Sequence, residues 1–171
     1  MEGLFALGGV ALGWLLGVGT QIWRDRRQER IALSLLHNEV LGNIAQLDLA
    51  RRMGVDASGT IQLSHWERRW RLSRQAWDRH GATAMGALDD DAIAAVQDSH
   101  HALDAAELLL EEGREAVIAV RELELTTGDN AAAVDRVETE DAGRRERLGV
   151  QLDALHKAHE AIDQKLGLSG H

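Results

Sequence analysis

The 171-residue sequence predicts an all-α protein in which one N-terminal transmembrane helix continues into a cytoplasmic antiparallel helical bundle. Proline, the residue that most sharply breaks helices, is absent. Aromatic residues that favour strands are scarce, with no tyrosine and one phenylalanine, whereas alanine, leucine, glutamate and arginine are common. Apolar residues also recur at helical spacing in most of the chain, which is the main sequence signal of amphipathic helices.

The first expected element is a membrane anchor over residues 1–23. Residues 3–23 carry no charge, and as a helix they would rise about 31 Å, close to the thickness of a hydrocarbon core of about 30 Å. A cleaved signal peptide is the alternative, but it would begin with a basic region and end at a small-residue cleavage site. The chain begins Met1-Glu2 and shows no such site before Trp23, so we expect a retained anchor.

Basic residues directly after this segment predict the orientation of the anchor across the membrane. Four arginines follow at once, and because cytoplasmic flanks are rich in arginine and lysine, the domain of residues 24–171 is expected in the cytoplasm. The protein would then be a single-pass protein of the inner membrane with its N-terminus outside. The residues expected at the membrane interface are Trp23, Arg24, Arg26, Arg27 and Arg30.

Glycines recur every four residues in the same segment, at Gly9, Gly13 and Gly17. Small residues at this spacing let a second helix approach closely. The stripe therefore predicts packing against a second copy of the chain or against a membrane protein partner. The alternative is that the glycines reflect composition alone.

The first cytoplasmic helix is expected over residues 24–53. Its buried stripe follows steps of three and four residues, widened by Leu35 and Ile44. Glu39 and Asn43 lie at or near this stripe, where polar side chains can fix the register of a bundle; they could instead face solvent as a polar pair. The residues of the stripe itself are Leu33, Leu36, Val40, Asn43 and Leu47.

The second helix, expected over residues 61–80, combines tryptophan with arginine. Its face is interrupted at Ser73, which could instead cap a short helix starting at Arg74. Three interpretations stay open: a membrane surface, a protein-binding surface, or an ordinary bundle helix with tryptophans inside and arginines in water. Gly81 and Gly86 are expected to bracket a break. The candidate partner or lipid surface comprises Trp66, Arg68, Arg69, Trp70, Arg71 and Trp77.

The two last helices, residues 90–125 and 130–166, are joined by a short turn and predict an antiparallel hairpin. Asp89-Asp90-Asp91 can cap the first of them. The second has a heptad pattern in its C-terminal half, whereas its N-terminal half places Asp141 and Arg144-Arg145 at or near inward positions. The heptad positions are Leu148, Leu152, Leu155, His159, Ile162 and Leu166.

Three segments resemble small membrane-anchored helical proteins of unknown function from actinobacteria and their phages or prophages. They are Leu35–Ile44 (LLHNEVLGNI), Ala76-Trp77-Asp78 and the helix start at Leu88-Asp89. The resemblance implies a similar architecture and, among other roles, phage or prophage exclusion or defence. It supplies no activity and no functional residues.

Histidines are the candidates for metal chemistry, since the absence of cysteine excludes thiolate sites and disulfides. Asp98 and His101, like Asp153 and His156, are three residues apart and share a helix face, a spacing used by di-iron bundles with glutamate. Such bundles need carboxylates from two further helices, for which only Glu39 suggests itself. We therefore expect no metal or cofactor. The alternative is a metal-binding or sensory module that uses His100, His101, His156 and His159.

No phosphate loop, dinucleotide motif or nucleophile motif is found in the sequence, and no enzyme activity is expected. Residues 1–80 carry eleven basic and eight acidic residues (+3), whereas residues 81–171 carry eight basic and twenty acidic residues (−12). Because nucleic-acid binding requires a cationic surface, this acidic half argues against it. The sequence predicts an interaction protein: an oligomeric scaffold, a regulator or an accessory subunit, with membrane lipid and a homo-oligomer or membrane protein as partners.

Overall fold

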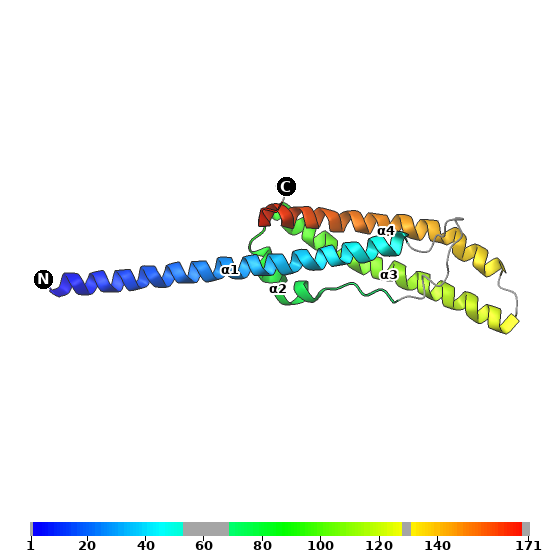
Figure 1. Ribbon diagram of the computed structural model, residues 1–171, viewed down its shortest axis with the longest axis horizontal. Helices are drawn as coiled ribbons and strands as arrows, with labels where there is room; N and C mark the ends of the chain where they lie inside the picture. Colours follow the sequence, from blue (N-terminus) through cyan, green and yellow to red (C-terminus); the bar gives the residue numbers. More distant parts are fainter. Residues whose placement is uncertain (1, 53–68, 128–130, 169–171) are drawn as a thin grey trace.

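The computed structural model describes residues 2–52, 69–127 and 131–168, without the side chains of residues 2–13, 15 and 127. Within these ranges the chain forms four helices, which confirms the predicted all-α class (Figure 1). They are α1 (Glu2–Arg52), α2 (Gln75–Met85), α3 (Asp90–Thr127) and α4 (Ala131–Leu166).

The bundle is built on the antiparallel pair of α3 and α4, as the short connection between two long helices predicts. The C-terminal half of α1 packs along α4, and α2 packs against α1. The N-terminal half of α1 continues in a straight line and projects beyond the bundle in Figure 1.

The core agrees with the helical periodicity of the sequence. All five residues of the α1 stripe are buried, from Leu33 to Leu47, and they meet the heptad face of α4. Ile44 is buried as well, but the prediction for Leu35 is wrong, because this side chain lies at the edge of the stripe and is exposed to solvent.

Charged residues replace apolar ones in the N-terminal half of α4, as predicted. Asp141 and Arg144 are both buried, and Asp141 forms an ion pair with Arg145 one turn later. Arg145 also donates a hydrogen bond of 3.0 Å from Nη1 to the carbonyl oxygen of Arg51, at the end of α1. This half of α4 is therefore joined to α1 by polar contacts where the apolar heptad is missing.

The boundaries of α2 differ from the prediction. Residues 69–74 are not helical, and the first part of the predicted 61–80 helix lies outside the described residues. The helix runs through Gly81, where no break occurs, and ends at Met85 before Gly86. At α3 the predicted cap is confirmed, since Asp89 Oδ1 accepts a hydrogen bond of 2.9 Å from the Ala92 N–H.

The membrane-anchor prediction requires a correction. Helix α1 runs from the N-terminal segment into the bundle without a break, as expected. However, no helix of the described residues is long and apolar enough to cross a membrane, which contradicts a single-pass protein of the inner membrane with its C-terminal domain in the cytoplasm. In the part of α1 whose side chains are described, Leu16, Val18 and Ile22 alternate with glycine, threonine and glutamine before the first arginine. These residues lower the mean hydropathy of the helix.

Candidate functional site

The most unusual surface of the molecule is the projecting part of α1. We use "the arm" for residues 14–23, the stretch of this projection whose side chains are described, Leu15 excepted. Every described side chain of the arm is exposed to solvent. Its large apolar residues are Trp14, Leu16, Val18, Ile22 and Trp23.

These apolar residues lie on two sides of the helix: Trp14, Val18 and Ile22 follow one stripe at four-residue spacing, and Leu16 and Trp23 lie on the opposite side. Between them, a Cβ added at Gly17 or Gly19 would meet no described atom within 4 Å, so the backbone is open to close approach. Gly9 and Gly13 belong to α1, but they lie in the stretch of the helix whose side-chain surroundings the structure does not describe. The arm is thus an exposed apolar helix that is thinner at Gly17 and Gly19, where no side chain covers the backbone.

A collar of arginines separates the arm from the bundle. Arg24, Arg26, Arg27 and Arg30 are all exposed, and the guanidinium of Arg27 lies 5.4 Å from the ring centre of Trp23. This contact is a cation–π interaction between a solvated cation and an exposed ring. The collar therefore marks the end of the uncharged surface.

A polar cluster between α1 and α2 explains why the tryptophan–arginine segment breaks at Ser73. Both carboxylate oxygens of Glu39 accept hydrogen bonds from the start of α2, from the N–H groups of Ala76 (2.8 Å) and Trp77 (3.0 Å). Asn43 makes two further bonds of 2.8 Å, to the N–H and the carbonyl oxygen of Ser73. Ser73 Oγ donates to Glu39 Oε2 at 2.7 Å.

This cluster satisfies the free N–H groups that begin a helix. Ser73 contributes only a long contact of 3.4 Å to the Gln75 N–H, so the main cap of α2 is Glu39, contributed by another helix. Glu39 and Asn43 thus do not form a polar pair that faces solvent, because both bind the start of α2.

The remaining residues of the tryptophan–arginine segment divide between core and solvent. Trp70 and Trp77 are partly buried against the hydrophobic core, whereas Arg69 and Arg71 are exposed. Trp66 and Arg68 lie outside the described residues.

The neighbouring Arg74 links the start of α2 to α3. Its guanidinium donates to Glu107 at 2.9 Å and to Asp104 at 2.7 Å. The hydrogen bond with Glu107 is the main cause that raises the pKa of Arg74. This arginine therefore holds the segment against α3.

The four histidines of the alternative metal-binding module are not gathered in one place. His100 stacks on Trp77 with ring centres 4.8 Å apart, while His101 and His156 are exposed. His159 instead lies beside His37 of α1, and the two ring centres are 4.7 Å apart. Both histidines approach Asp163, which the sequence analysis did not select.

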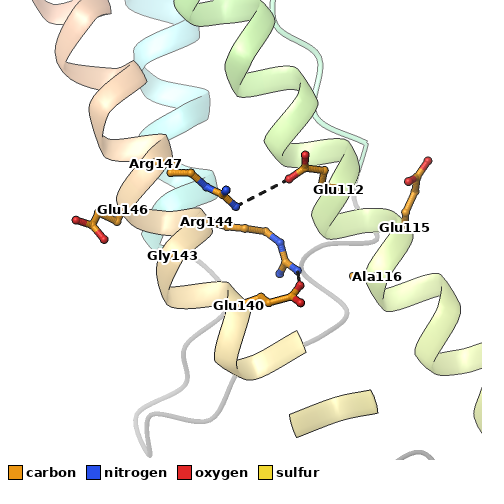
Figure 2. A pocket seen from close by; sticks show the side chains of 8 residues that line it. All are labelled: Glu112, Glu115, Ala116, Glu140, Gly143, Arg144, Glu146 and Arg147. Atoms are coloured by element: carbon orange, nitrogen blue, oxygen red, sulfur yellow. Dashed lines mark hydrogen bonds and ion pairs between the residues drawn. The ribbon is translucent and has the colours of Figure 1, made fainter. Parts of the chain in front are cut away.

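A groove lies between α3 and α4, near the end of the hairpin where the two helices diverge (Figure 2). Its volume is about 750 Å³, and its polar lining consists of glutamates and arginines. Arg144 Nη2 lies 2.6 Å from Glu140, and Arg147 reaches across the groove to Glu112 at 3.9 Å. Both arginines are therefore paired with glutamates of the groove, and the lining as a whole is acidic. Its residues are Glu112, Glu115, Ala116, Glu140, Gly143, Arg144, Glu146 and Arg147.

Comparisons with known proteins found no relative of this chain. No family model matches the chain, and neither the curated proteins nor the solved structures contain a significant match. The functional interpretation therefore depends on the surfaces described above, among which the arm exposes apolar side chains and His37, His159 and Asp163 bring three potential metal ligands together.

Proposed function

We propose that the protein is a helical interaction protein that assembles into an oligomer through the arm of α1. The observation that carries this proposal is the exposure of large apolar side chains on two opposite sides of the arm, which projects beyond the bundle. The bundle would then be the unit that the assembled arms hold together and display.

An apolar helix of this kind has a strong tendency to be covered. Exposed large apolar side chains that gather on one segment mark surfaces that bind a partner, and an isolated helix in water gains little stability from its backbone alone. Burying apolar surface stabilises by roughly 25 cal/mol per Å². The arm supplies such surface, while its own chain leaves it exposed.

A second copy of the chain is the occupant that the charges favour. Residues 3–23 carry no charge, so two arms can lie together without repulsion, whereas the whole chain has a net charge of −9. Because the arm projects from the bundle, a second copy can reach it without a rearrangement of the four helices (Figure 1). Most oligomers of soluble chains consist of identical subunits, which agrees with this choice.

The test is the molar mass of the full chain in solution, measured by sedimentation equilibrium. We expect wild type to be oligomeric and the double variant Leu16→Glu/Ile22→Glu to be monomeric at the same concentration. Both side chains are exposed in the single chain, so glutamate leaves the bundle intact, but between two arms it would bury charges without partners.

A matched control places the same substitutions on the bundle. Leu108→Glu/Val150→Glu changes residues of similar exposure (62% and 61%, against 63% for Leu16) on α3 and α4, and it should retain the wild-type mass. Gly17→Ile places a side chain where the backbone of the arm is open to close approach. This variant should weaken association at least about tenfold. Monomeric wild type, or dissociation of the control alone, would contradict the proposal.

A further inference from the structure

Three metal-ligating side chains from two helices converge on one point beside the core. His37 is contributed by α1, and His159 and Asp163 are contributed by α4, one helical turn apart. One carboxylate oxygen of Asp163 lies 2.7 Å from His37 Nε2, and the other lies 3.6 Å from His159 Nδ1. The carboxylate therefore lies between the two imidazoles, with one oxygen toward each.

The contacts inside this cluster are incomplete. His37 Nε2 and Asp163 Oδ1 are buried and close, yet neither forms a hydrogen bond of acceptable geometry with the described residues. Buried polar atoms are normally satisfied, so a pair of this kind requires an explanation. A metal ion that accepts lone pairs from His37 Nε2 and Asp163 Oδ1 would explain why the two atoms lie together.

The geometry suits a small cation. Each of the three residues offers one ligand atom, and these atoms all lie within 4.8 Å of one another. Zinc binds imidazole nitrogen and carboxylate oxygen at about 2.0–2.2 Å, which places neighbouring ligands of a tetrahedral site roughly 3.3 Å apart. The observed distances, 2.7 Å between His37 Nε2 and Asp163 and 3.6 Å between His159 Nδ1 and Asp163, lie on either side of this value.

The burial of the cluster is intermediate. The side chains of His37, His159 and Asp163 are 14%, 21% and 24% exposed, so they are shielded from bulk water but accessible to an ion. Two imidazoles with one carboxylate are typical ligands of borderline transition metals, and they are unsuited to calcium or magnesium, which prefer oxygen.

We infer that His37, His159 and Asp163 form a binding site for a divalent transition-metal ion of the zinc type, with the fourth position open to water. Because the ligands belong to different helices, the ion ties α1, which bears the arm, to α4. The site is independent of contact between arms, and either can fail without the other.

The test is titration of the tag-free, metal-stripped full chain with Zn²⁺, followed by calorimetry, and with Co²⁺, followed by its visible absorption. We expect one equivalent to bind and to raise the midpoint of thermal unfolding. His37→Gln and Asp163→Asn should each weaken binding at least about tenfold and abolish the thermal shift.

The matched control is His156→Gln, which removes an exposed histidine from the same helix and should bind like wild type. Circular dichroism of the metal-free variants shows whether they fold, which separates loss of a ligand from loss of structure. The inference is overturned if wild type binds no stoichiometric metal, or if folded His37→Gln and Asp163→Asn bind as tightly as wild type.

Discussion

Leu155→Ala is expected to lower the free energy of unfolding by about 2–5 kcal/mol, the range found when a large core side chain is truncated. Leu155 is fully buried at the centre of the heptad face of α4, with Leu148 and Ile162 equally buried two turns away on either side. Since α4 is the helix that contacts both α1 and α3, a cavity at this position removes packing at the centre of the bundle.

Chemical denaturation followed by circular dichroism measures this change. Leu125→Ala is the control, because Leu125 is 87% exposed, and its truncation should change stability by less than about 0.5 kcal/mol. An equally small change for Leu155→Ala would show that α4 presents another face to the core.

The second large effect is expected from the polar cluster that holds α2. Asn43→Ala leaves the N–H and carbonyl oxygen of Ser73 without partners, and Glu39→Ala uncovers two N–H groups at the start of α2. Each unsatisfied buried group costs about 1–3 kcal/mol. The two groups that each variant uncovers are only partly buried, so water can satisfy them in part, and we expect each variant to lower the free energy of unfolding by about 1–3 kcal/mol in total.

The two variants should also be coupled, since both act on Ser73 and α2. Once one substitution has released α2, the second removes less stabilisation. The loss of free energy of unfolding in the double variant should therefore be smaller than the sum of the losses in the two single variants. Denaturation of the two single variants and the double variant measures this coupling. Full additivity would mean that the two side chains stabilise α2 independently.

Helical periodicity predicted the core because burial on a regular helix repeats with the pitch of the helix itself. The stripe from Leu33 to Leu47 and the heptad from Leu148 to Ile162 therefore needed no tertiary information. The cap of α2 could not be found in this way. Glu39 lies 37 residues before Ala76, and only the packed bundle brings them together.

The histidine cluster was missed for a related reason. Spacing within one helix drew attention to pairs such as Asp153 and His156, whereas the observed cluster also needs the rotation of α1 against α4. A partial signal was present, because His159 and Asp163 are four residues apart and share a face of α4. His37 follows the buried Leu36 directly, which places it at the margin of the stripe.

The arm shows a different limit of sequence analysis. Absence of charge over residues 3–23 indicated a membrane span, but the same property is expected of a helix that packs against another copy. The distinguishing feature is the context of the helix, which the sequence of one chain does not contain.

Hydrogen exchange of the arm as a function of protein concentration tests the central claim most directly. An arm that packs against a second copy should have backbone amides between Trp14 and Trp23 that exchange more slowly as the concentration rises, because association buries them. The amides of α2, which lies within one bundle, should exchange at the same rate throughout. Arm amides that exchange equally fast at every concentration would contradict assembly through the arm.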